Sequence, residues 1–166
     1  MTNDRESLGR RDVLGLAALA GLAALPVPAL AGGTKLSAVE QVNRDLVARF
    51  CAAWDALDIE RIVGLITEDF IYQPFDKAPL THGIAEFRAF VQPFLESSRA
   101  IRFEILRTHV IGPVVVNERI DHILAKPGGK DMAYPIAGVF QIDGGRIRIW
   151  YGFFMPGYQP EAPPAT

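Results

Sequence analysis

The chain has 166 residues, which is enough for one ordinary domain and too few for several. Hydrophobic residues make up 49% of it and charged residues 22%, a balance that excludes a disordered or collagen-like protein. With 17 basic and 19 acidic residues the formal net charge is -2, so no basic excess favours nucleic acid as a partner. The single cysteine, Cys51, excludes an intrachain disulfide and a thiolate metal site.

Residues 1–31 have the pattern of an export signal. Arg10 and Arg11 precede a short run rich in alanine, leucine and glycine, and residues 29–31 have the small-x-small form of a cleavage site. The paired arginines resemble a twin-arginine signal, and the apolar run is short for a membrane span. The sequence therefore predicts a signal peptide, no stable membrane anchor, and a periplasmic or extracellular protein.

Three helices are predicted in the first half of the mature chain. The first begins with a capping box formed by Ser37 and Glu40. Asp58 can cap a second, shorter helix that extends to Ile66, and Gly83 opens a third, which Pro93 bends or ends. The first helix is amphipathic, because apolar residues recur every three or four positions: Val39, Val42, Leu46, Phe50 and Trp54.

Strands dominate the second half. A short strand over residues 70–73 precedes the third helix, and beyond residue 98 the apolar period changes to two. Pro135 and Gly138 suggest a bulge or bend in one of these strands. Turns rich in glycine divide this half into strands over residues 101–105, 114–125, 132–142 and 146–154. We expect one domain over residues 32–158, followed by a proline-rich tail over residues 159–166.

This order of elements implies an α+β fold. Three helices would cover one face of a strongly bent, mostly antiparallel sheet. Such a sheet closing over the helices makes a cone with an apolar hollow, where a small apolar molecule would bind.

The candidates for chemistry lie on strands. Residues of one parity share a face, so Arg119 and Asp121 are neighbours, roughly 6–7 Å apart along their strand, on the face that also carries Asn117. An arginine beside a carboxylate in an apolar hollow can orient an acid/base residue, and the alternative is an ordinary ion pair on a half-exposed sheet. Tyr72 could present its phenol to the hollow. One face of the last strand carries Trp150, Gly152 and Phe154. We expect these three residues and Asn117 to line the hollow.

No metal or cofactor motif is recognisable. His82, His109 and His122 lack metal-ligand spacing, and Glu118 lies roughly 13 Å along a strand from His122. The chain has no Gly-x-Ser-x-Gly element, phosphate-binding glycine loop or dinucleotide fingerprint. We therefore expect neither a metal nor a cofactor.

Several segments together resemble the limonene-1,2-epoxide hydrolase family: Tyr72-Gln73, residues 117–121, residues 138–141 and Trp150. That family belongs to the superfamily of nuclear transport factor 2, ketosteroid isomerase and the SnoaL-like polyketide cyclases, which share a cone-shaped fold. The resemblance extends over residues 38–158. Its most telling feature is the Arg-x-Asp element on a central strand.

The resemblance implies roles for individual residues. Arg119 corresponds to the bridging arginine of the family, Asp121 to the aspartate that protonates the epoxide oxygen, and Tyr72 to a tyrosine that holds water. Two positions depart from the family pattern, because Pro74 stands where a water-holding asparagine is expected and Gly152 where a second aspartate is expected. Neither side chain can take a proton from water.

These departures leave three functions open. The first is an epoxide hydrolase-like enzyme with Asp121 as the acid. The second is an isomerase or cyclase that moves a proton with Asp121 alone, because without a second carboxylate only burial opposes its ionisation beside Arg119. The third is a non-catalytic module that binds a small ligand or dimerises. By analogy with the superfamily, a homodimer is expected to form on the outer sheet face, which carries Glu118, His122, Tyr151 and Phe153.

Overall fold

The computed structural model describes residues 35–157; the signal peptide predicted over residues 1–31 and the tail predicted over residues 159–166 lie outside the described residues. The elements follow the chain as α1 (Ala38–Asp55), α2 (Ile59–Val63), β1 (Ile66–Gln73), β2 (Thr81–His82), α3 (Gly83–Ser97), β3 (Ser98–Ile111), β4 (Val114–Ala125), β5 (Met132–Asp143) and β6 (Arg146–Phe154). Within residues 35–157, the helices are too short or too polar to traverse a bilayer.

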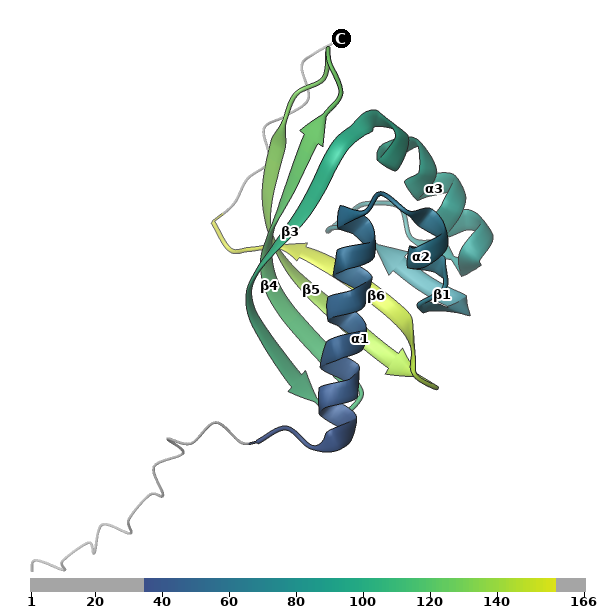
Figure 1. The fold of residues 1–166 in the computed structure, drawn as a ribbon, viewed down its shortest axis with the longest axis vertical. Coiled ribbons are helices and arrows are strands. Elements are labelled where there is room, and N and C mark those ends of the chain that lie inside the picture. Colours follow the sequence, from purple (N-terminus) through teal and green to yellow (C-terminus); the bar gives the residue numbers. More distant parts are fainter. Residues whose placement is uncertain (1–34, 158–166) are drawn as a thin grey trace, which may run out of the picture. The chain divides into compact units, whose positions relative to one another are not determined.

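The strands form one six-stranded sheet in the order β2-β1-β6-β5-β4-β3. Neighbouring strands are antiparallel except β1 and β6, which run parallel. The edge strands β2 and β3 do not pair with each other, so the sheet stays open. Figure 1 shows α1 crossing in front of the long strands, with α2 and α3 beside β1. The predicted α+β fold, with helices packed on a mostly antiparallel sheet, is confirmed.

Helix α1 begins where the capping box places it. The Ser37 backbone N–H donates to Glu40 Oε2 over 2.9 Å, and the Glu40 N–H donates to Ser37 Oγ over 3.3 Å. The predicted apolar stripe is wrong at this end, since Val39 and Val42 are 66% and 59% exposed. Here the helix meets the turn between β3 and β4 through polar atoms: Asn43 Nδ2 donates to the carbonyl of Gly112, and Glu40 accepts from its N–H. This contact turns both valines outward.

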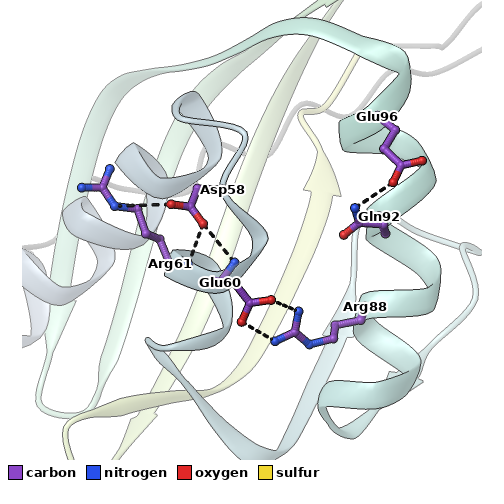
Figure 2. Close-up of polar contacts among 6 residues, drawn as sticks. All are labelled: Asp58, Glu60, Arg61, Arg88, Gln92 and Glu96. Carbon is purple, nitrogen blue, oxygen red and sulfur yellow. Dashed lines mark hydrogen bonds and ion pairs between the residues drawn. The ribbon is translucent and has the colours of Figure 1, made fainter.

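Helix α2 has the predicted cap but is shorter than expected. Asp58 Oδ1 accepts the N–H groups of Glu60 and Arg61, both over 3.1 Å. The helix ends at Val63, and Ile66 begins β1. Figure 2 shows how α2 is joined to α3: the guanidinium of Arg88 donates twice to the Glu60 carboxylate, over 2.5 and 2.7 Å.

Helix α3 continues through Pro93 to Ser97, so of the two expected effects of the proline, a bend or an end, the end is wrong. A proline inside a helix removes one backbone hydrogen bond. The buried face of α3, formed by Phe87, Val91 and Leu95, spans the proline and holds the helix on both sides of it.

The strands agree with the prediction best where glycine turns delimit them. Strands β4 and β6 have the predicted ends, and Gly144 and Gly145 turn the chain between β5 and β6 with φ of 54° and 76°. The pairing of β4 with β5 is continuous, so the bulge predicted at Pro135 or Gly138 is absent from it. A register shift occurs instead between β5 and β6, after Gln141. Strand β1 is longer than predicted, β3 extends to residue 111, and β2 was not predicted.

An aromatic cluster fills the space between α1, α3 and the sheet. Trp54 of α1 is fully buried and contacts Phe87, Tyr72 and Trp150, with ring centroids 6.3, 6.4 and 5.4 Å away. Tyr72 and Trp150 are neighbours on the paired strands β1 and β6, and their ring centroids lie 4.7 Å apart. Burial of these large aromatic side chains stabilises the fold. The cavity described below lies against this cluster.

Candidate functional site

A cavity of about 200 Å³ opens beside this cluster. Side chains from α1, α3 and every strand except β2 line it, together with the loop after β1, and most of them are aromatic or aliphatic. Among the described residues, Arg119 and Asp121 of β4 are the only charged residues in the lining. The predicted Tyr72, Trp150 and Phe154 line the same cavity. The structure thus brings five of the predicted site residues to one apolar chamber.

Arg119 and Asp121 form a bidentate ion pair. Arg119 Nε donates to Asp121 Oδ1 over 2.6 Å, and Arg119 Nη2 donates to Oδ2 over 3.1 Å. Their side chains are 1% and 13% exposed. This burial argues against the alternative of an ordinary half-exposed pair, since little water reaches either group. Each carboxylate oxygen keeps further lone pairs, so the pairing leaves Asp121 able to accept a proton.

Arg119 is fixed on its edges and on its faces. Its Nη1 donates to Asn117 Oδ1 over 2.8 Å, and Asn117 Nδ2 lies 3.8 Å from Cys51 Sγ on α1. The guanidinium carbon lies 4.9 Å from the ring centre of Phe103 and 5.2 Å from that of Trp150. Asn117 is predicted as a pocket residue, but it lies behind Arg119 and is absent from the lining.

Two opposing effects act on the Asp121 carboxyl group. Burial raises its pKa above the ordinary value, and this effect is the largest. The charge and hydrogen bonds of Arg119 lower the pKa, with a smaller contribution from His122. Burial prevails, so Asp121 holds its proton at higher pH than an exposed aspartate does.

The Tyr72 hydroxyl can donate a hydrogen bond at this site but cannot act as a base there. The residue is 5% exposed, and burial raises the pKa of its phenol. The hydroxyl therefore keeps its proton at neutral pH. Burial likewise raises the pKa of the Cys51 thiol to about 12, which removes it as a nucleophile.

Pro74 and Gly152, the two positions that depart from the resembled family, contact each other. A Cβ atom added to Gly152 would lie 1.9 Å from the carbonyl oxygen of Pro74. The loop after β1 therefore occupies the space in which a side chain at position 152 would begin. Gly152 is absent from the cavity lining, whereas Pro74 is part of it. Among the described lining residues, Asp121 is the only carboxylate.

Several lining residues escaped the sequence analysis. Tyr134 lies on the same face of β5 as Gly138 and is the register partner of Asp121 on the neighbouring strand β4. The period-two pattern could therefore have identified it. Phe75 comes from the loop after β1 and stacks on Phe154, with ring centroids 5.2 Å apart. Phe90 lies on the less buried side of α3. No periodic signal singles out these two phenylalanines.

The remaining titratable candidates lie on the outer face of the sheet. His122 contacts Glu104 over 2.7 Å, and Arg107 donates to Glu118 over 2.6 Å. No group of three histidine, cysteine, aspartate or glutamate side chains within residues 35–157 is placed to hold a metal ion.

Known proteins share this architecture. Residues 47–150 match the family described as the SnoaL-like domain. Among solved structures, an LEH-like epoxide hydrolase of M. tuberculosis is 21% identical, with a TM-score of 0.62 over 70% of this chain and 84% of that one. A protein described as a SnoaL-like polyketide cyclase of Jannaschia sp. is 18% identical, with a TM-score of 0.63 over 73% and 90%.

A second such cyclase, of Shewanella denitrificans, is 20% identical, with a TM-score of 0.63 over 69% of this chain and 90% of that one. At these identities the likeness establishes the fold, and the chemistry must be argued from the site itself.

Proposed function

The chain belongs to the SnoaL-like domain family, and for its cavity we propose proton transfer to and from carbon, carried out by Asp121 on a small apolar carbonyl compound. The observation that carries this proposal is the contact between Pro74 and Gly152. Hydrolysis of an epoxide in one step needs an acid and a second group that activates water. Because the Pro74 carbonyl fills the position of that second group, Asp121 is left as the acid/base residue.

The proposed reaction begins with Asp121 ionised. One carboxylate oxygen takes a proton from the carbon next to the substrate carbonyl, and the electron pair of that C–H bond moves to form the enolate. In a substrate with a C=C bond next to that carbon, the enolate is conjugated with it, and Asp121 returns the proton to the far carbon of the C=C bond, which moves the double bond. In a cyclase, the enolate carbon instead attacks a second carbonyl of the same molecule, and the proton goes to the new alkoxide. No water enters either sequence.

Tyr72 and Arg119 supply the complementary electrostatics. The Tyr72 hydroxyl stays protonated and can donate a hydrogen bond to the enolate oxygen. Arg119 lines the same cavity, and its guanidinium cation attracts the negative charge that develops on the enolate oxygen. Apart from Asp121, the rest of the cavity lining is aromatic or aliphatic, and such surroundings of low polarity strengthen both interactions.

One observation favours a second candidate, an epoxide hydrolase-like reaction. Tyr72, Arg119 and Asp121, the three residues to which the resemblance assigns water holding, bridging and epoxide protonation, line one cavity. The M. tuberculosis structure with this fold is an LEH-like epoxide hydrolase. This reaction would need a water-activating group other than position 152.

A substrate panel separates the two candidates. The protein is incubated with enolisable ketones and with terpene epoxides in ¹⁸O-labelled water, and products are identified by mass spectrometry. Isomerised or cyclised ketones are expected, with no more ¹⁸O than spontaneous exchange of the carbonyl oxygen introduces without protein. A labelled diol from an epoxide would establish the hydrolase instead. Saturable binding of either class without any product would overturn both reactions and identify a binding module.

We further propose that the protein is exported and acts as a homodimer. The twin arginines and the cleavage pattern of residues 1–31 support export to the periplasm or beyond. The outer sheet face supports self-association, since Tyr151 is half-buried there and Phe153 is 38% exposed. Cell fractionation of the full chain and analytical ultracentrifugation of the mature chain test these two proposals separately.

A further inference from the structure

Gly138 is a glycine for a reason other than backbone conformation. Positive φ angles occur at six glycines among the described residues, and Gly138 is not one of them. It lies in a regular part of β5, directly opposite Asn117 of β4. An alanine could therefore adopt this backbone without strain. The requirement for glycine must come from the space around its α-carbon.

The guanidinium of Arg119 fills that space. A Cβ atom at position 138 would lie 2.1 Å from Arg119 Nη1, 2.7 Å from Asn117 Oδ1 and 3.0 Å from the Phe140 ring. Arginine usually escapes such a collision, because its end is flexible. Arg119 cannot move freely, because it donates to Asp121 and Asn117 and lies against two aromatic rings.

We propose that Gly138 and Asn117 are positioning residues that hold the guanidinium of Arg119 in register with the carboxylate of Asp121. Because Gly138 has no side chain, Arg119 Nη1 can occupy the space beside its α-carbon. Asn117 closes that end with a 2.8 Å hydrogen bond, and its amide is in turn held near Cys51 of α1. The opposite edge of the guanidinium is then aligned for its two bonds to Asp121. The functional meaning of this arrangement rests on the proposed role of Asp121, whereas the arrangement itself does not.

The titration of Asp121 reports on this register without any substrate. The charged and titratable groups that act on it are Arg119 and His122 on β4, with Cys51 on α1 and Tyr72 on β1 coupled to it. Arg119 lowers the Asp121 pKa through charge and hydrogen bonds. Displacing the guanidinium should therefore raise that pKa, by about one pH unit.

The test is ¹³C NMR titration of the Asp121 carboxyl in Gly138→Ala, Arg119→Lys and the double variant. Lysine has no atom equivalent to Nη1, so the added methyl group meets no guanidinium. We expect Gly138→Ala to raise the Asp121 pKa when Arg119 is present and to leave it unchanged in the Arg119→Lys background. Gly138→Ala that unfolds with Arg119 but folds in the Arg119→Lys background would also support the proposal. An unchanged titration, or an equal shift in both backgrounds, would overturn it.

Asn117→Ala provides a second, less disruptive test, since it removes the acceptor without adding volume. The expected result is again a raised Asp121 pKa, and Asn117→Asp should raise it further because a like charge then shares Arg119. Gly64→Ala serves as a control far from the site. Unshifted titration in both Asn117 variants would refute the role of Asn117. If the panel of ketones and epoxides gives no product, the proposed function fails while these titrations still decide the inference.

Discussion

The pKa of Asp121 is set by two opposing effects, desolvation and a neighbouring charge. Burial favours its neutral form, and Arg119 favours its ionised form. Because its pKa is raised, the ionised Asp121 carboxylate is a stronger base than that of an exposed aspartate. The position of the balance is therefore the property on which the proposed chemistry depends.

The pH dependence of the reaction follows from this balance. Asp121 acts as a base only when ionised, so kcat/KM should rise with pH through its raised pKa and then level off. The midpoint should lie above the ordinary value of 3.8. Initial rates on an enolisable ketone from about pH 3 to pH 8 measure it. A rate that is flat across this range, or falls with rising pH, would contradict Asp121 as the base.

Gly152 should not tolerate a side chain. Gly152→Ala brings a methyl group against the Pro74 carbonyl, and overpacking of this kind costs about 1–3 kcal/mol. Urea denaturation of the variant and of the wild type gives the difference in unfolding free energy. Gly64→Ala is a matched control, because its added Cβ would meet its nearest atom at 3.3 Å. Equal stability of Gly152→Ala and the wild type would show that the loop moves aside.

At the residue scale, period-two alternation was enough to predict part of the site. It placed Arg119 with Asp121 and Trp150 with Phe154, because each pair shares a strand and a parity. The contact of Pro74 with Gly152 was not predictable, because it joins a loop to a strand far away in the chain. The role of Asn117 behind Arg119 depends on which rotamer the arginine adopts, and sequence does not specify that.

At the scale of elements, α2 depends on its cap more than on its ion pair. Asp58 accepts two backbone N–H groups that otherwise lack partners, so Asp58→Ala should cost about 1 kcal/mol. Arg88→Ala breaks a pair in which the Glu60 side chain is 73% exposed, and should cost less. Urea denaturation of both variants gives the order. A larger loss from Arg88→Ala would mean that the link between α2 and α3 stabilises the fold more than the cap does.

Elements were predicted best where the chain itself marks their ends. Glycine turns delimit β4 and β6, and a capping box starts α1. Errors arose where tertiary contacts decide, as at Val39 and Val42, which the polar contact with Gly112 turns outward. The two-residue strand β2 exists only through its pairing with β1, so no local signal could predict it.

At the scale of the whole molecule, the buried carboxyl group should affect stability. Folding raises the pKa of Asp121, so the folded chain binds that proton more tightly than the unfolded chain. This stabilisation is fully present below the ordinary pKa of 3.8 and is lost as pH rises through the raised pKa. Asp121→Asn removes the ionisable group. As pH rises through this window, wild type loses stability and Asp121→Asn does not. The unfolding free energy of the variant minus that of wild type should therefore increase.

Urea denaturation of both proteins at several pH values measures that difference. Other carboxylates, including Glu40 and Glu60, have lowered pKa values and act in the opposite direction, but they are common to both proteins and cancel. A gap that stays constant with pH, or moves against the variant, would show that the pKa of Asp121 is not raised by folding.

Exchange of a substrate proton with solvent tests proton transfer by Asp121 most directly. An enolisable ketone is incubated with the protein in D₂O, and NMR follows deuterium entering the carbon next to the carbonyl. Wild type should accelerate this exchange, and the exchange rate with Asp121→Asn should be lower by about 10²–10⁴-fold. Exchange that proceeds equally fast in Asp121→Asn would contradict the account, because the proton would then be moved by another group.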